Sequence, residues 1–281
     1  MPASAPTERP IAVFDSGVGG LTVLQELLVE LPREDFIYLG DTARFPYGER
    51  SADELRAFAL EIAELLLARR AKLLVVACNA ASAAALGALR ERMLSTTLGV
   101  HVTGVIEPES RLAAGASHNR RIGLLATSAT VRSAAYARAV AEHAPDAELI
   151  SVACPDLAPI IQQGFPFDHR VVDTVRGYCS PLREAGVDTV ILGCTHYPLI
   201  APMLQRMLGP GVQMITSGRS LAISVARALD EAGLRTTRER EGEYRFLCTG
   251  DVEAFCELGS RFLQMPIEHV EHVAFPLAEA A

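Results

Sequence analysis

Two apolar runs of this sequence, far apart along the chain, end in a cysteine: Leu73-Leu74-Val75-Val76-Ala77-Cys78-Asn79 and Val190-Ile191-Leu192-Gly193-Cys194-Thr195-His196. Uninterrupted apolar runs of this length are typical of parallel strands that are buried on both faces. In open α/β sheets the chemistry lies beyond the carboxyl ends of such strands, where both thiols would stand. The pair therefore suggests one site with an acid/base thiol on each face of a substrate.

Strand-like runs alternate with helical patterns along the whole chain, which indicates α/β architecture. The expected strands cover 11–14, 36–39, 73–77, 100–105, 122–125, 149–152, 190–192, 212–215 and 244–247. Three of them repeat at a nearly constant offset, because residue 11 aligns with 122, residue 36 with 149 and residue 73 with 189. The alternative is that α/β units resemble one another without duplication.

The repeat predicts two similar three-layer α/β lobes with mainly parallel sheets, related by a pseudo-twofold axis, with the active site between them. We expect residues 1–99 plus 210–281 to form the first lobe and residues 100–209 the second. The strands near 212 and 244 have no counterpart in a third lobe, so we expect both to return to the first.

Composition excludes several classes of protein. The 281 residues are 49% apolar and carry a formal net charge of −8 with no basic block, which disfavours nucleic-acid binding. The polar N-terminus shows no signal peptide, and the longest apolar stretch, 73–89, fits a strand entering a helix better than a membrane span. The six cysteines form no CxxC pair, so we expect reduced thiols, no metal and a cytoplasmic location.

Two glycine-containing loops follow expected strands. The first, Asp15-Ser16-Gly17-Val18-Gly19-Gly20, can hold an anion on its backbone N–H groups, and Asp15 can enter the cleft or simply cap the next helix. The second contains Pro46-Tyr47-Gly48, where Tyr47 and Gly48 can offer a hydroxyl and a backbone donor. The alternative for the second loop is a surface turn.

The surroundings of the two cysteines differ. Cys78 would begin a helix, whose free N–H groups give a thiol thiolate character, although a lone cysteine after a strand is usually inert packing. Cys194 is followed two residues later by His196, which can hydrogen-bond to the thiol. A metal pair or a purely structural histidine are the alternatives there.

Together these motifs resemble the glutamate racemases of the cofactor-independent aspartate/glutamate racemase superfamily. The matching segments are Phe14-Asp15-Ser16-Gly17-Val18-Gly19-Gly20-Leu21-Thr22-Val23, Gly40-Asp41-Thr42, Pro46-Tyr47-Gly48, Ala77-Cys78-Asn79, Gly104-Val105-Ile106-Glu107-Pro108, Ala126-Thr127 with Thr130-Val131, and Leu192-Gly193-Cys194-Thr195-His196-Tyr197-Pro198-Leu199. Beyond residue 199 the resemblance is weaker and depends mainly on chain length.

The resemblance implies roles for individual residues. Cys78 would deprotonate the D-enantiomer with help from Asp15, and Cys194 the L-enantiomer with help from His196. The implied substrate-binding residues are Ser16, Pro46, Tyr47, Gly48, Asn79, Ala80, Thr127, Thr130 and Thr195. Neither a metal nor a pyridoxal cofactor is required.

Three positions depart from the family pattern. Ala80 stands where the family usually has Thr, which removes a hydroxyl hydrogen bond worth about 0.5–3 kcal/mol. Gln162 replaces a usual Glu and cannot carry its charge on the His196 side. Thr216-Ser217-Gly218 replaces a segment that often begins with Asp.

We therefore expect a cytoplasmic glutamate racemase that supplies D-glutamate for peptidoglycan, with glutamate as its partner and neither nucleic acid nor membrane, and we expect it to form a homodimer. One alternative is a racemase of aspartate or a related acid, which Ala80 motivates. Another is a binding or regulatory protein in which these departures have weakened catalysis.

Overall fold

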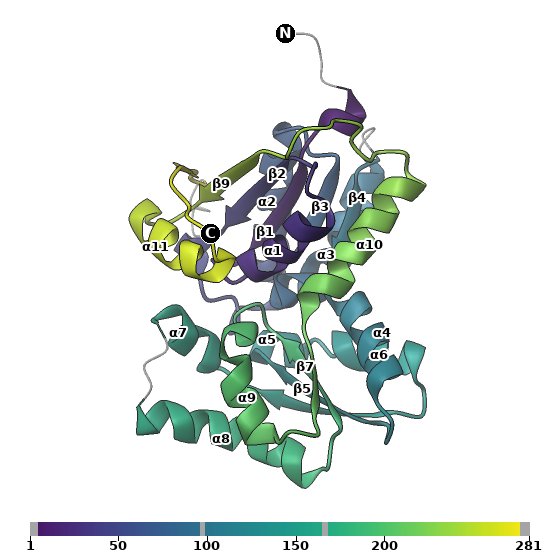
Figure 1. Ribbon diagram of the computed structural model, residues 1–281, viewed down its shortest axis with the longest axis vertical. Helices are drawn as coiled ribbons and strands as arrows, with labels where there is room; N and C mark the ends of the chain where they lie inside the picture. The colour runs from purple at the N-terminus through teal and green to yellow at the C-terminus, as the bar shows by residue number, and fades with distance from the viewer. Residues whose placement is uncertain (1–4, 96–98, 165–167, 276–281) are drawn as a thin grey trace.

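The computed structural model describes residues 5–95, 99–164 and 168–275, and their strands form two parallel sheets (Figure 1). The first sheet has the strand order β10-β9-β2-β1-β3-β4. Its strands are β1 (Ile11–Asp15), β2 (Phe36–Gly40), β3 (Leu73–Val76), β4 (His101–Gly104), β9 (Tyr244–Cys248) and β10 (Val270–His272). The second sheet has the order β6-β5-β7-β8, from β5 (Arg121–Ala126), β6 (Glu148–Ala153), β7 (Thr189–Gly193) and β8 (Gln213–Ile215).

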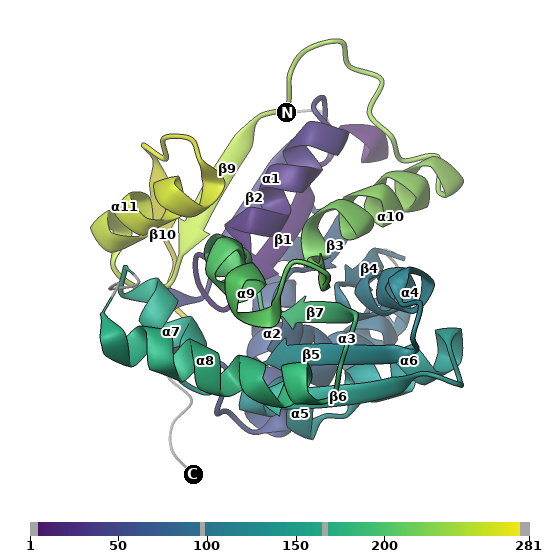
Figure 2. The same cartoon turned by 60° about the horizontal axis from the view of Figure 1, so that its bottom comes forward.

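Helices cover the sheets and connect their strands, as Figure 2 shows from a second direction. The α-helices are α1 (Leu21–Glu30), α2 (Ala52–Ala68), α3 (Asn79–Ser95), α4 (Ile106–Ala116), α5 (Ser128–Arg132), α6 (Ala135–His143), α7 (Leu157–Gln162), α8 (His169–Glu184), α9 (Ala201–Leu208), α10 (Ser217–Glu231) and α11 (Val252–Leu263). Short 3-10 turns lie at η1 (Pro6–Glu8), η2 (Thr42–Arg44) and η3 (Tyr197–Ile200). Among the described residues no helix combines the length and apolar character needed to cross a bilayer.

The two sheets repeat one another in strand order and in register. In the first sheet Ile11 pairs with Phe36 on one side and with Leu73 on the other. In the second, Ile122 pairs with Leu149 and Thr189, at the positions that the sequence offset predicts. The repeat extends to a fourth strand, because β4 pairs with β3 as β8 pairs with β7. The predicted α/β fold with two similar lobes is thus confirmed.

The predicted lobe boundaries at residues 100 and 210 differ from the positions at which the chain passes from one sheet to the other. The strand expected at 100–105 belongs to the first sheet as β4, and the strand expected at 212–215 belongs to the second as β8. The prediction that the strand at 212–215 returns to the first lobe is wrong. In each sheet one edge of β3 or β7 stays unpaired until a further helix and a parallel strand, β4 or β8, cover it, and only then does the chain pass to the other lobe. The chain therefore crosses between lobes after Gly104 and after Ile215.

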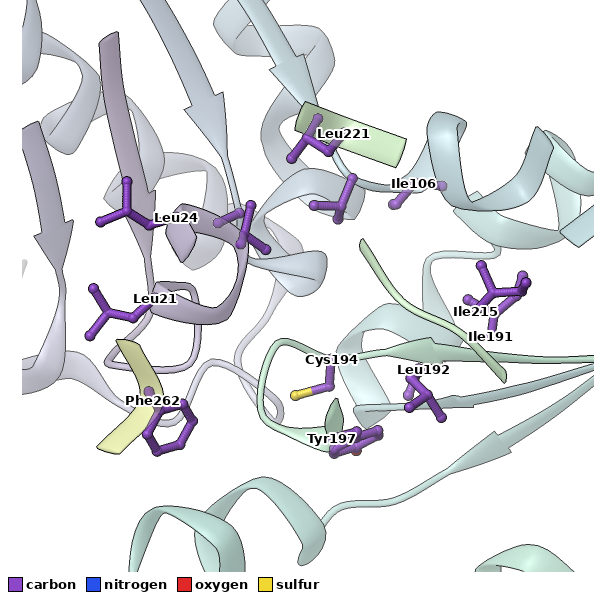
Figure 3. Close-up of a cluster of buried hydrophobic side chains, with 14 of the residues drawn as sticks. Leu21, Leu24, Ile106, Ile191, Leu192, Cys194, Tyr197, Ile215, Leu221 and Phe262 are labelled. Atoms are coloured by element: carbon purple, nitrogen blue, oxygen red, sulfur yellow. The ribbon is translucent and has the colours of Figure 1, made fainter. Parts of the chain in front are cut away.

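The hydrophobic cores of the two lobes are in contact near the points where the chain passes from one lobe to the other. Figure 3 shows buried side chains from both, with Leu21 and Leu24 of α1 on one side and Ile191 and Leu192 of β7 on the other. Helix α10 follows β8 but packs against α1 of the first lobe and against α4. This shared apolar core holds the carboxyl ends of β1, β3 and β7 together.

Candidate active site

One pocket lies between the lobes and is lined by both predicted catalytic thiols. Cys78 follows β3 and Cys194 follows β7, so the two occupy equivalent places in the repeat. The two cysteines are 5% and 7% exposed, and both line this pocket. The pocket is also lined by the predicted residues Ser16, Pro46, Tyr47, Gly48, Asn79, Ala80, Thr127, Thr195 and His196.

Burial dominates the chemistry of the Cys78 side. It raises the pKa of the Cys78 thiol to about 12, and the negative charge of Asp15 adds to that rise. Hydrogen bonds from the backbone of Ala81 and from Ser16 act in the opposite direction but do not compensate. The thiolate character expected from the start of α3 is therefore outweighed, and Cys78 rests as a thiol that becomes a strong base once it is deprotonated.

Asp15 lies at the end of β1, fully buried behind the pocket rather than in its lining. Its Oδ2 accepts a hydrogen bond of 3.0 Å from the backbone N–H of Gly17, and its Oδ1 accepts one of 3.2 Å from the hydroxyl of Thr195. Burial raises its pKa to about 6. Because Thr195 belongs to the second lobe, Asp15 joins the lobes while its charge acts on both Cys78 and Cys194.

The glycine loop after β1 packs closely against the other lobe, and its Gly17 N–H donates to the Asp15 carboxylate. A Cβ atom at Gly19 would stand 2.4 Å from His196 Nδ1 and 2.4 Å from Thr195 Oγ1. A Cβ atom at Gly20 would stand 2.5 Å from the Asp15 Cβ. Only glycine lets this loop approach His196 and Thr195 of the other lobe so closely.

His196 completes the Cys194 side. Its Nδ1 lies 3.9 Å from the Cys194 Sγ, and its Nε2 lies 2.8 Å from the Gln162 Oε1. The ring packs against Phe45 and Phe262. Burial lowers the pKa of His196 to about 3 and raises that of Cys194 well above its usual value. A neutral imidazole with Nε2–H donated to Gln162 has Nδ1 as its acceptor, which lies near both the thiol and the Thr195 hydroxyl, 3.5 Å away.

The loop that contains the cis bond Phe45-Pro46 closes one wall of the pocket. The backbone O of Gly48 accepts a 2.7 Å hydrogen bond from the N–H of Ala129, which ties the loop to α5 of the second lobe. Tyr47 is 2% exposed and its hydroxyl donates to the buried Asp41. The alternative of a surface turn is therefore wrong, but the Tyr47 hydroxyl has only acceptor capacity left for a substrate.

Two predicted binding residues stand apart from the rest. Thr130 is 1% exposed and does not line the pocket; its Oγ1 lies 3.0 Å from the Oγ1 of Thr127, which caps α5. Ala80 lines the pocket without a polar group. In the described part of the chain no group of three or more His, Cys, Asp or Glu side chains is arranged to hold a metal.

Several residues that hold the site together have no role assigned to them from the sequence. Phe45 packs on the His196 ring, Asp41 receives the Tyr47 hydroxyl, and Tyr136 accepts a 2.7 Å hydrogen bond from the Asn79 amide. Asp41 directly follows a buried strand, which was a usable signal. Tyr136 lies within a helix and had none.

A family model described as Asp/Glu/Hydantoin racemase matches residues 21–224, which include both cysteines. The chain belongs to this racemase family. The predicted resemblance and the predicted enzyme class, an isomerase, are confirmed.

Relatives and solved structures of the family match nearly the whole chain. A glutamate racemase from Geobacter metallireducens is 44% identical over 91% of this chain and 93% of its own. A solved glutamate racemase from Bacillus anthracis superposes with a TM-score of 0.90 at 37% identity, covering 96% of this chain and 99% of that one. Another, from Francisella tularensis in complex with D-glutamate, has a TM-score of 0.87 at 34% identity and covers 95% and 98%.

Proposed function

We propose that this racemase interconverts L- and D-glutamate with Cys78 and Cys194 as its two acid/base groups. One observation carries the proposal: the two thiols line a single pocket from equivalent positions of two repeated lobes. The relatives that match most of the chain are named glutamate racemases, and one of the solved structures contains D-glutamate.

The reaction breaks and re-forms the bond between the α-carbon and its hydrogen. One cysteine, as thiolate, takes the α-proton and becomes a thiol, while the opposite thiol gives its proton to the other face and becomes a thiolate. The electron pair left on the α-carbon is stabilised only in a dry, preorganised polar site, which fits thiols that are 5% and 7% exposed.

Each thiol needs a group that takes its proton before abstraction, and the two sides supply different ones. His196 Nδ1, 3.9 Å from Sγ, serves Cys194. For Cys78 the resemblance implies Asp15, which is fully buried at the end of β1 and whose negative charge raises the pKa of that thiol. In the direction that the resemblance implies, Cys78 deprotonates D-glutamate and Cys194 deprotonates L-glutamate.

The substrate is held by polar groups around the thiols. Ser16, Thr127 and Thr195 present hydroxyls at the pocket, Gly48 a backbone N–H, and Asn79 an amide. Thr130 acts through Thr127, and Tyr47 through its remaining acceptor capacity. Pro46 and Ala80 complete the apolar wall.

We further propose that the product D-glutamate enters peptidoglycan synthesis and that the enzyme works in the cytoplasm. A mechanism with two free thiols needs a reducing compartment, and the six cysteines are all unpaired. Depletion of the enzyme should make growth depend on added D-glutamate; growth without it would contradict this role.

Cysteine variants test the chemistry directly. Cys78→Ser and Cys194→Ser should each lower the racemisation rate by at least about 100-fold, the usual contribution of a positioned acid or base. Cys256→Ser, which alters a thiol on α11 outside the pocket, is the matched control and should keep the wild-type rate. Wild-type rates in both pocket variants would rule out the two-thiol mechanism.

Aspartate is the second candidate substrate, because Ala80 leaves a pocket wall without the hydroxyl that the family pattern has there. The ratio of kcat/KM for L-glutamate and L-aspartate decides between them. A ratio above about tenfold, or 1.4 kcal/mol, in favour of glutamate excludes aspartate as the main substrate.

A further inference from the structure

Glu109 is a buried acid that the racemisation chemistry does not use. It lies on α4, just after the chain first crosses between the lobes, and it is 0% exposed. Buried acids of this kind are retained where their hydrogen bonds are satisfied, and this one has partners on three other helices.

Its two carboxyl oxygens join the elements that surround the pocket. Oε2 accepts hydrogen bonds from the Tyr136 hydroxyl of α6 and, at 3.3 Å, from Asn79 Nδ2 of α3. Oε1 lies 2.5 Å from the Ser217 hydroxyl, at the start of α10 where the chain crosses back. Glu109 thus connects both chain crossings to the residue that follows Cys78.

These contacts fix the orientation of the Asn79 amide. Nδ2 donates to Glu109 and to the Tyr136 hydroxyl, so the nitrogen side faces the second lobe. Oδ1 is buried and has no hydrogen-bond partner among the described residues. Asn79 also lines the pocket beside Cys78, and a buried acceptor that is left unpaired is costly. A donor on the substrate, its ammonium group, would satisfy it.

Burial also acts on the charge of Glu109. It raises the pKa of this carboxyl to about 8, with the hydroxyls of Ser217 and Tyr136 acting against the rise. Burial therefore favours the neutral carboxylic acid, while the donors on its two oxygens favour the carboxylate. A glutamine side chain has the same shape and the same kinds of groups.

We propose that Glu109 is a positioning residue of this racemase, which holds the Asn79 amide so that its Oδ1 receives the ammonium group of the substrate. The inference rests on the proposed function, since it requires an amino acid in the pocket. The buried hydrogen-bond network of Glu109 on α4, Tyr136 on α6 and Ser217 on α10 would act on the substrate only through Asn79.

The test compares Glu109→Gln with Glu109→Leu by steady-state kinetics on both enantiomers, with thermal unfolding to verify folding. The Leu variant removes every hydrogen bond and should raise KM at least about tenfold for both enantiomers, while the Gln variant should stay within about threefold of wild type. The matched control is Ser110→Ala, which removes a neighbouring buried hydroxyl that has no hydrogen-bond partner in the described part of the chain and should leave KM and kcat unchanged.

Should the Leu variant fail to fold, Tyr136→Phe decides, because it removes only the hydroxyl that receives the Asn79 amide. It should raise KM several-fold, because the hydroxyl both accepts from Asn79 and donates to Glu109, so that two hydrogen bonds are lost. A folded Leu or Phe variant with wild-type KM, a loss confined to kcat, or an equal effect of Ser110→Ala would overturn the inference. A wild-type enzyme that does not racemise glutamate would instead defeat the proposed function.

Discussion

Burial shifts the pKa of each side chain that we propose to be catalytic toward its neutral form. Cys78 and Cys194 rest as thiols, His196 is neutral, and the pKa of Asp15 is raised to about 6. Each thiol therefore becomes a strong base only after it has lost its proton. Small changes in the partners of His196 and Asp15 should alter how readily the thiols ionise.

Gln162→Glu tests the partner of His196. A carboxylate at this position would accept from Nε2–H and attract the imidazolium form, so the pKa of His196 should rise from about 3 by one unit or more. NMR titration of the histidine ring measures it, and Gln163→Glu on the adjacent exposed residue is the control. An equal shift in both variants, or none in the first, would refute the contact.

Asp15 should give the enzyme an acidic limit to its activity. The carboxylate is the form that assists Cys78, and its pKa of about 6 means that kcat/KM falls as the pH is lowered through 6. Asp15→Asn should lower kcat/KM by about 100-fold and remove this limb of the profile. An Asn variant that keeps the same limb near pH 6 would show that another group titrates there.

At the scale of elements, the loops that follow β1, β2, β3 and β7 form the site by close contact between lobes. The loop after β1 approaches His196 and Thr195 so closely that no side chain fits at Gly19. The loop after β2 is tied to α5 through Gly48 and Ala129. These contacts bring together residues of the proposed site that lie far apart in the sequence.

Gly19→Ala should therefore disturb catalysis more than folding. Its methyl group would displace His196 or Thr195, and a misplacement of this kind costs about 100-fold in rate. The control is Gly87→Ala in α3, where a methyl group meets nothing within 4 Å and should raise stability by about 0.5–1 kcal/mol. Activity assays with thermal unfolding measure both; an active Gly19→Ala enzyme would contradict the packing.

The sequence predicted the elements whose signals are local. The buried runs of β1, β3 and β7 and the residues that follow them were found, because parallel strands and their functional ends have a clear pattern. Strand β10 was missed, since Val270–His272 has only three residues, of which Glu271 and His272 are exposed. Glu109 and Tyr136 were missed because only the packing of α4 against α6 brings them to Asn79.

At the scale of the whole molecule, the chain crosses twice between two lobes of the same design. The sequence placed these crossings a few residues too early, because strand partners depend on which sheet edge is free and not on the strand's own residues. The predicted homodimer stays a prediction. Light scattering should give twice the chain mass of 30.2 kDa, and a mass of one chain at micromolar concentration would contradict it.

The two-thiol account is tested most directly by racemisation in D2O, followed at early times from each pure enantiomer. Because the proton donor on the far face has exchanged with solvent, the first D-glutamate formed from L-glutamate should carry deuterium at the α-carbon, while the remaining L-glutamate keeps its hydrogen. The reverse reaction should behave in the same way. A product that retains the original α-hydrogen, or a substrate labelled as fast as the product, would contradict two bases on opposite faces.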